Sequence, residues 1–242
     1  MRAIVVRIFP CLLVFLVTPI SAFEFGLVAE ASKNAESLLV NGRNISINTG
    51  GIGLQTSVRF FGDHLDLSAS VLFASNGDSA ATFSGATVSG PAKLAMSSAT
   101  IKAYAFPDSR LTPLASYTVL KRTGDIDFTG FRNTVPASGT ARITYDQEAW
   151  ALGFRFAISP DISVELKRGK HQWGLLSNAK GSLGAVKIST AIEAGNLDTF
   201  NALSLRYKVG AWLYLGEYGS YELRADNQTT TNNLKISACY MF

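Results

Sequence analysis

Residues 150–166 read WALGFRFAISPDISVEL, and this stretch decides the fold class. Apolar and aromatic side chains occupy alternate positions before Ser159-Pro160-Asp161 and again after it, with small or charged residues between them. A period of two is the signature of a β-strand, and a turn sequence between two such runs predicts a β-hairpin. The same unit recurs around three more short turns, at residues 61–64, 107–110 and 209–210.

The alternating runs predict ten strands, with eight as the alternative count. Most runs reach or exceed the roughly 9 to 11 residues that a membrane-spanning strand needs. Between the hairpins lie long links rich in Gly, Ser, Thr and Asn, near residues 33–45, 75–92, 124–140, 175–197 and 225–232. Short turns on one side and long loops on the other are typical of outer-membrane barrels. We therefore expect an all-β fold, a transmembrane antiparallel up-and-down β-barrel.

Composition supports this class. The chain has 242 residues, of which 47% are hydrophobic and only 17% charged, and this composition excludes intrinsic disorder. Residues 1–22 combine Arg2 and Arg7 with an apolar run and end in the small residue Ala22, which predicts a cleaved signal peptide. The barrel domain is then 23–242. It keeps 20 basic and 18 acidic residues, a balance that does not favour nucleic-acid binding.

The end of the chain completes a recognisable pattern. Phe242 is the last residue, and Tyr240 and Ala238 precede it at alternating positions. With the signal peptide and the hairpin of residues 150–166, this ending resembles the small bacterial outer-membrane β-barrels of the OmpA-transmembrane and opacity-protein type. The resemblance implies a place in the outer membrane of a Gram-negative cell, contact with outer-membrane lipid, and an assembly signal at Tyr240 and Phe242 for the barrel assembly machinery.

Charges of both signs fall on the face of the strands that is expected to line the lumen. Isolated buried charges are costly, so we expect these side chains to pair. The preferred interpretation is an ion-pair network that largely closes the lumen, and the alternative is a narrow porin-like channel for small solutes lined by the same groups. The residues are Glu24, Glu30, Arg59, Asp66, Arg155, Glu165, Lys167 and Arg206.

Aromatic residues near the ends of the predicted strands suggest two girdles at the membrane interfaces. The expected outer girdle, near the long loops, consists of Tyr145, Trp173, Tyr218 and Tyr221.

The leading functional hypothesis is a structural or surface-interaction barrel at the cell surface, with an extracellular ligand bound through the long loops. A third hypothesis is an outer-rim enzyme acting on lipid or peptide. Outer-membrane proteases of the omptin type use Asp and His at the rim, but His171 has no evident acidic partner, since Asp125, Asp127 and Asp226 approach it only if loops fold inward. We predict no catalytic set, no cofactor and no metal site, because two separated histidines and one cysteine do not supply tetrahedral ligands.

Overall fold

The computed structural model describes residues 20–34, 38–40, 43–83 and 86–242. The charged and apolar parts of the predicted signal peptide, residues 1–19, lie outside the described residues. The first strand begins at Ile20, so it includes the last residues before the predicted cleavage after Ala22, which stays a prediction.

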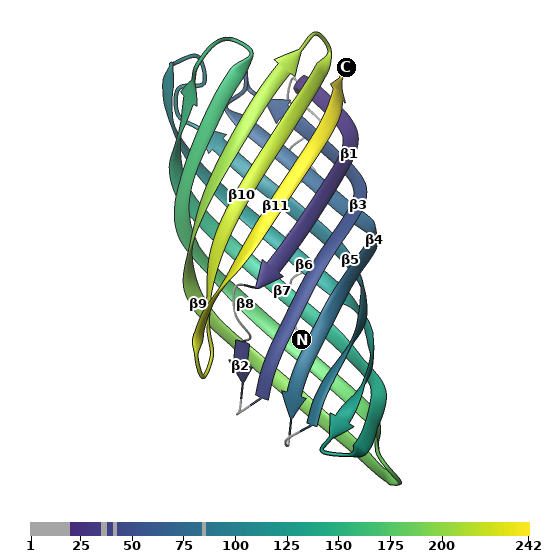
Figure 1. The fold of residues 1–242 in the computed structure, drawn as a ribbon. Coiled ribbons are helices and arrows are strands. Elements are labelled where there is room, and N and C mark those ends of the chain that lie inside the picture. The colour runs from purple at the N-terminus through teal and green to yellow at the C-terminus, as the bar shows by residue number, and fades with distance from the viewer. Residues whose placement is uncertain (1–19, 35–37, 41–42, 84–85) are drawn as a thin grey trace.

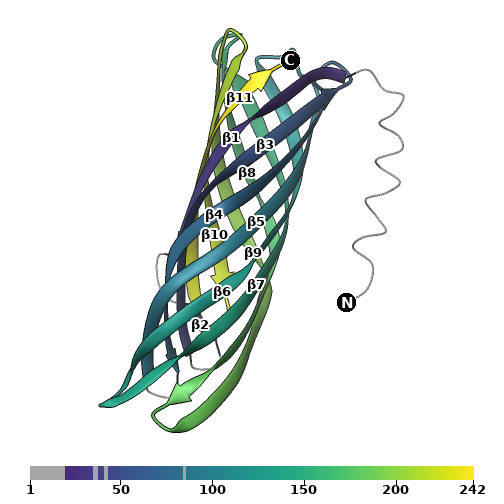
Figure 2. The same cartoon turned by 90° about the vertical axis from the view of Figure 1, so that its right-hand side faces the viewer.

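The strands follow one another around a ring (Figures 1 and 2). Their bounds are β1 (Ile20–Asn34), β2 (Leu38–Val40), β3 (Arg43–Phe60), β4 (Leu65–Phe83), β5 (Ala86–Tyr104), β6 (Leu111–Arg132), β7 (Val135–Ala157), β8 (Ile162–Leu183), β9 (Val186–Val209), β10 (Trp212–Arg224) and β11 (Gln228–Met241). Within the described ranges, no helix is long and apolar enough to cross a membrane.

Pairing of the first strand with two partners closes the ring. β1 pairs antiparallel with β11, with Glu24 opposite Met241, and with β3, with Glu24 opposite Ser57. β1 and β3 to β11 thus form a closed antiparallel barrel of ten strands, and the predicted fold class is confirmed. The short β2 pairs with β3 beyond the end of β1, and the carbonyl of Leu39 accepts a hydrogen bond from the Asp226 amide in the β10–β11 turn.

The two ends of the barrel differ. The four short turns lie at one end, together with Phe242, whose amide donates to the carbonyl of Phe23. At the other end the hairpins extend much further, as the lower part of Figure 1 shows. The short β9–β10 connection depends on Gly210, whose φ of 58° is a conformation that suits glycine.

The predicted long loops are largely strand. β6 and β7 meet at a turn after Arg132, and β8 and β9 meet at a turn after Leu183, where links of many residues were expected. Alternation continues through these links, since Ile126 and Phe128 are buried while Asp125 and Asp127 are exposed. The high content of Gly, Ser and Thr in these links suggested loops. The alternation of apolar and polar residues and the pairing with neighbouring strands make them strands instead. The strands therefore run well beyond the length that a bilayer needs.

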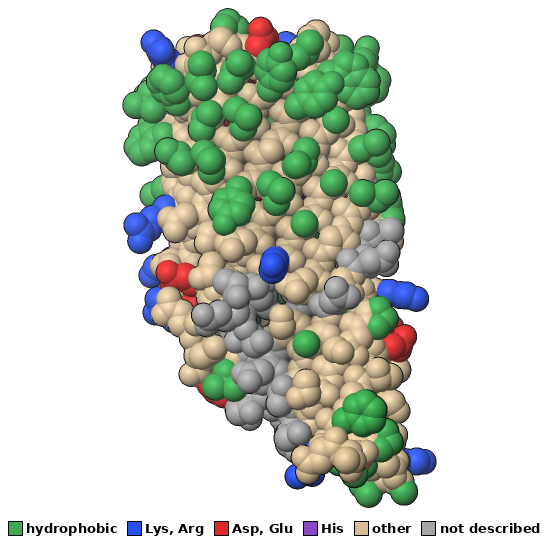
Figure 3. Space-filling view, in the orientation of Figure 1, with side chains coloured by type: hydrophobic (Ala, Val, Ile, Leu, Met, Phe, Trp, Pro, Cys, Tyr) green, Lys and Arg blue, Asp and Glu red, His purple; other side chains and the backbone are tan. Residues whose placement is uncertain are grey.

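An apolar belt surrounds the end with the short turns, as the hydrophobic side chains in the upper half of Figure 3 show. Beyond it, exposed outward positions become charged, as at Lys121, Asp146, Arg168 and Lys170. The exposed belt residues include Phe25, Leu27, Ile52, Phe73, Ile101, Leu111, Trp150, Leu152, Phe154, Phe156, Leu166, Leu203, Leu205, Tyr207, Trp212, Tyr214, Leu234, Ile236 and Tyr240.

The predicted outer aromatic girdle is wrong for three of its four members. Tyr218 faces outward and is exposed, but Trp173 is buried inside the barrel, and Tyr145 and Tyr221 pack against interior clusters. The girdle was predicted from the position of these residues along their strands. Whether a side chain meets lipid depends instead on which face of the strand it occupies. Trp173 shares the inward face of β8 with Lys167, six residues earlier.

The belt predicts a position-dependent penalty for charge on β9. Leu205 and Leu197 point outward from the same strand face and are almost equally exposed, at 49% and 48%, but only Leu205 lies in the belt. We expect Leu205→Arg to lower the free energy of unfolding by about 2–4 kcal/mol in lipid vesicles. Leu197→Arg, the matched control, is expected to cost less than about 1 kcal/mol. Urea titration of the refolded protein measures both, and equal losses would contradict this membrane boundary.

Candidate functional site in the lumen

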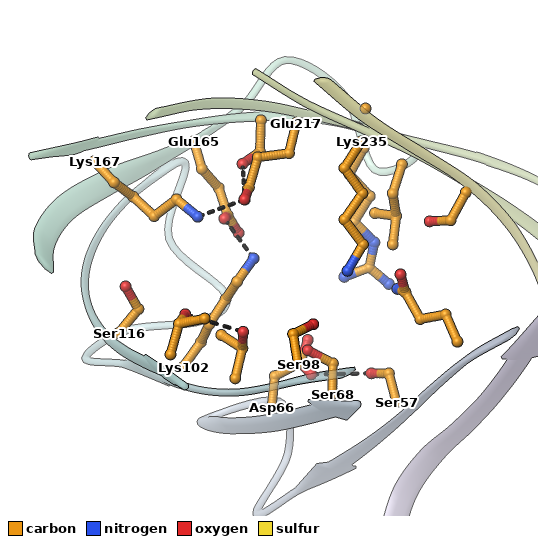
Figure 4. A pocket seen from close by; sticks show the side chains of 18 of the residues that line it. Ser57, Asp66, Ser68, Ser98, Lys102, Ser116, Glu165, Lys167, Glu217 and Lys235 are labelled. Carbon is orange, nitrogen blue, oxygen red and sulfur yellow. Dashed lines mark hydrogen bonds and ion pairs between the residues drawn. The ribbon is translucent and has the colours of Figure 1, made fainter. Parts of the chain in front are cut away.

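A polar cavity of about 130 Å³ occupies the lumen at the level of the membrane belt. Ten charged side chains line it, five of each sign, together with serine and threonine hydroxyls, several of which are drawn in Figure 4. These side chains are on the inward face because that face alternates with the lipid-facing residues of the same strands. The charged residues are Glu24, Glu30, Asp66, Glu165, Glu217, Arg59, Lys102, Lys167, Arg206 and Lys235.

The central group of charges joins strands that are not neighbours in the ring. Nζ of Lys102 on β5 lies 2.8 Å from Oε2 of Glu165 on β8, and the Tyr104 hydroxyl donates to Oε1 of Glu165 at 2.7 Å. Nζ of Lys167 on β8 lies 2.6 Å from Oε2 of Glu217 on β10. Figure 4 draws this ion pair and the one between Lys102 and Glu165. Since β6 and β7 separate β5 from β8, the Lys102–Glu165 pair crosses the lumen.

A second group lies near β1. Glu24 is almost completely buried, forms an ion pair with Arg59 of β3, and accepts a longer contact of 3.4 Å from Arg206 of β9. Arg59 also approaches Asp66 at 3.9 Å. Glu24 thus lies between two guanidinium groups, of which Arg59 also has Asp63 at 3.6 Å and Arg206 reaches Glu24 past β10 and β11.

A third bridge separates this cavity from a smaller one. Arg122 of β6 reaches Glu30 of β1 at 2.9 Å, and Asn233 donates to the same Glu30 oxygen at 2.8 Å. A cavity of about 70 Å³, lined by Arg122, lies beyond, and both cavities share Gln147, Tyr221 and Asn233 in their linings. The lumen therefore holds two adjoining cavities with side chains reaching across between them.

The predicted lumen residues are placed as follows. Glu24, Glu30, Arg59, Asp66, Glu165, Lys167 and Arg206 all line the polar cavity. Arg155 does not line it. Its guanidinium donates to the carbonyl of Pro107 and lies over the Tyr104 ring, 4.5 Å from the ring centre, where it helps to cover the end with the short turns.

Sequence reasoning missed Lys102, Arg122, Glu217 and Lys235 as members of this network. Each lies on the inward face of its strand, so strict alternation identifies the face, but only the register shows which strand its partner is on. Lys235 donates to Ser70 at 3.2 Å, and within the described part of the chain no carboxylate lies within ion-pair distance of it. Among the residues that the structure describes, no group of His, Cys, Asp and Glu is suited to hold a metal ion.

The outer half of the lumen is filled differently, by an apolar cluster. Its buried side chains come from seven strands and meet inside the extended part of the barrel. Apolar contact of this kind excludes water and stabilises the wall from within. The cluster consists of Val40, Val88, Ala92, Leu94, Ile126, Phe128, Ala137, Ala141, Ile143, Trp173, Leu175, Ile192 and Leu223.

His171 lies at the boundary of these two regions and is not at the rim. It is fully buried, its Nε2 donates to the carbonyl of Glu222 at 2.8 Å, and its ring packs edge-on against Tyr221 and Phe200. Its acidic neighbour is Asp198, directly opposite on β9, which sequence reasoning did not identify. Because the predicted loop after residue 174 is strand, His171 lies in mid-strand and its side chain is buried.

Asp198 is engaged by other groups. Its Oδ2 accepts hydrogen bonds of 2.8 Å from the Trp173 indole and from the Arg224 amide, and the Arg224 guanidinium lies 3.5 Å from Oδ1. The outward positions beside His171, Lys170 and Gln172, are polar and exposed, so this level lies beyond the apolar belt. Burial lowers the pKa of His171, because a charged imidazolium would lose its hydration there.

Because Glu24 is buried between two arginines, we expect its replacement to destabilise the barrel more than the replacement of a residue in an exposed ion pair. Glu24→Gln leaves Arg59 and Arg206 without their shared carboxylate, and we expect a loss of about 3–5 kcal/mol in the free energy of unfolding. Asp146→Asn breaks the exposed pair with Lys121 and serves as the control, with an expected change below about 1 kcal/mol. Urea unfolding in detergent compares them, and similar changes in both would argue against a buried network.

The buried His171 predicts a pH dependence of stability. Because its pKa is lower in the folded than in the unfolded state, stability is complete above the ordinary histidine pKa and falls as the pH drops from about 7 to 5. We expect His171→Gln to flatten this part of the profile. His64→Gln, in the exposed turn at residues 61–64, is the control and keeps the wild-type slope. An unchanged slope in His171→Gln would contradict the assignment.

Comparison with known proteins gives the fold and no closer relation. No protein-family model matches the chain, and no curated protein does either. Solved structures do. The translocator domain of autotransporter NalP from Neisseria meningitidis matches with a TM-score of 0.56 and 12% identity over 98% of this chain and 94% of that one.

Two further solved structures also match the chain. The outer membrane protease OmpT from Escherichia coli matches with a TM-score of 0.57 and 9% identity over 92% of this chain and 97% of that one. Ail, the attachment invasion locus protein of Yersinia pestis, matches with a TM-score of 0.36 and 13% identity over 93% of this chain and 100% of that one. The closed ring, the apolar belt and these similarities agree: this chain has the fold of the bacterial outer-membrane β-barrels and is placed in that membrane, as its sequence predicts.

Proposed function

We propose that this protein is a closed barrel that holds a rigid, extended structure on the outer surface of the outer membrane, where that structure makes contacts, and that it does not conduct solutes. The observation that carries the proposal is that side chains meet across the lumen at successive levels. Lys102 with Glu165 and Arg122 with Glu30 are such pairs, and each joins strands that are separated in the ring.

The outer half supports the same conclusion. Trp173 is 2% exposed and Phe128 is 6% exposed, inside a part of the barrel that lies beyond the lipid. A conducting pore needs a continuous wetted path, whereas this apolar cluster lines the smaller cavity of about 70 Å³ and disfavours water there. The same cluster gives the extended hairpins an interior of their own, as a surface-exposed support requires.

A narrow channel is the second candidate, and the polar cavity is the observation that favours it. Mixed charges lining a space of about 130 Å³ resemble the lining of a selective pore. The cross-lumen pairs weigh against it, since each would have to separate for a solute to pass.

We also propose that the end of the chain is read during assembly. Phe242 is 75% exposed, and its ring lies 5.0 Å from that of Tyr240 and 5.7 Å from that of Phe23. An exposed aromatic terminus beside the closing strand is available to assembly machinery before the β1–β11 seam forms.

Planar-bilayer conductance tests the closed lumen. The wild type, shown to be folded by heat-modifiable gel mobility, is expected to give no discrete steps. Arg122→Ala alone is expected to stay silent, because the apolar cluster still closes the outer half. Lys102→Ala, Arg122→Ala and Trp173→Ala together remove one obstruction at each level, and this triple variant is expected to conduct.

The matched control replaces the same residue types. Trp150 faces outward in the belt, so Lys102→Ala and Arg122→Ala with Trp150→Ala remove as much side chain but leave the apolar cluster intact, and this variant should stay silent. Steps from the folded wild type would overturn the closed barrel in favour of the channel. Silence from the folded Lys102→Ala/Arg122→Ala/Trp173→Ala variant would show that these three residues are not the obstruction.

A further inference from the structure

Two hairpins reach furthest from the apolar belt, at the end opposite the short turns (Figures 1 and 2). They are the β6–β7 hairpin, which turns through Asn133 at a φ of 54°, and the β8–β9 hairpin, which turns through Gly184 at a φ of 59°. Their ends contact each other, since the Gly184 amide donates to the carbonyl of Pro136 at 2.8 Å. A Cβ added to Gly184 would lie 3.1 Å from Cγ1 of Val135.

The joined ends carry apolar side chains that point into solvent. Phe131 is 62% exposed, Val186 is 63% exposed and Val135 is 42% exposed. Figure 3 shows hydrophobic side chains gathering again at this lower end, apart from the belt. We call Phe131, Val135 and Val186, with the adjoining Arg132 and Lys187, the apical patch.

The charge of the apical patch has one sign. Arg132 and Lys187 are both exposed, and residues 131–137 and 182–188 contain no acidic residue. Asp127 is the first acidic residue back along β6, four positions before Phe131. Exposed apolar groups flanked only by cations are complementary to a surface with an anionic outer layer and an apolar layer under it.

We propose that the apical patch inserts shallowly into a phospholipid bilayer with anionic headgroups, presented by a membrane that faces the cell surface. An aromatic ring and two aliphatic side chains enter the acyl boundary, while Arg132 and Lys187 remain at the headgroup phosphates. The proposal rests on the proposed function, because it requires the extended end to face outward.

The shape of the end favours lipid over a protein partner. A stable protein interface buries about 800 Å² on each partner and needs complementary packing. Three apolar side chains at a protruding end provide much less than that. Lipid needs no preformed complement, since headgroups rearrange around a protruding group.

Vesicle binding tests the proposal directly. The full mature protein is held in nanodiscs of phosphatidylcholine and mixed with large vesicles of phosphatidylcholine alone or with 30% phosphatidylglycerol, a composition chosen as about one third anionic lipid. We expect co-flotation with the anionic vesicles only. Phe131→Trp is expected to show a blue-shifted emission on binding, relative to the same variant without vesicles, because its indole leaves water.

Variants separate the apolar and the charged contributions. Phe131→Ser with Val186→Ser should lose binding by tenfold or more, and Arg132→Gln with Lys187→Gln should weaken it about fivefold for each cation. Leu176→Ser with Leu197→Ser removes two exposed apolar side chains from the wall, and this control should bind as the wild type does. Heat-modifiable mobility confirms that each variant folds.

Absence of binding to anionic vesicles would overturn the proposal, and so would an equal loss of binding in the wall variant. Binding that polyglutamate abolishes and that gives no blue shift would also overturn it, because it would indicate that the apical patch recognises an acidic protein surface instead. The apical variants should remain silent in planar bilayers. A barrel that conducts but still binds vesicles would refute the closed lumen and leave the apical patch intact, so the two failures are distinguishable.

Discussion

A bilayer offers the backbone no hydrogen-bond partner, and every other feature of this molecule follows from that constraint. β1 must pair on both sides, with β3 and with β11, and the ring closes at ten strands. A ring of that size leaves room for side chains and little more. The charges that alternate with lipid-facing residues are therefore forced together, and most of them are paired, because leaving them unpaired would be costly.

The two halves of the interior reflect the two surroundings of the wall. Where the outside is apolar, the inside is polar, as at Leu166 outside and Glu165 and Lys167 inside β8. Beyond the belt the pattern reverses, with Arg168 and Lys170 outside and His171 and Trp173 inside. One strand thus serves as a membrane strand and then as the wall of an ordinary apolar core, and that core packs against the extended hairpins from within.

Alternation in the sequence was enough to predict the class of fold, the four short turns and the inward face of residues such as Glu24 and Glu165. It could not place partners, since Lys102 meets Glu165 only through the register and the diameter of the ring. It also failed beyond the belt, where Gly, Ser and Thr in residues 75–92 and 124–140 suggested loops. Tyr145, Trp173 and Tyr221 were assigned by their distance from the turns rather than by their face, and the outer apolar core was missed in consequence.

The central claim is that the lumen is closed, and the rate at which a small water-soluble thiol reagent modifies a lumen cysteine tests it most directly. Thr118 lines the polar cavity, and Cys239 is buried and can be replaced by serine to leave one reporter. In the folded mature protein, Thr118→Cys is predicted to react far more slowly than Asp146→Cys on the exposed wall, and at the same rate once unfolded. Equal rates in the folded protein would contradict a closed lumen.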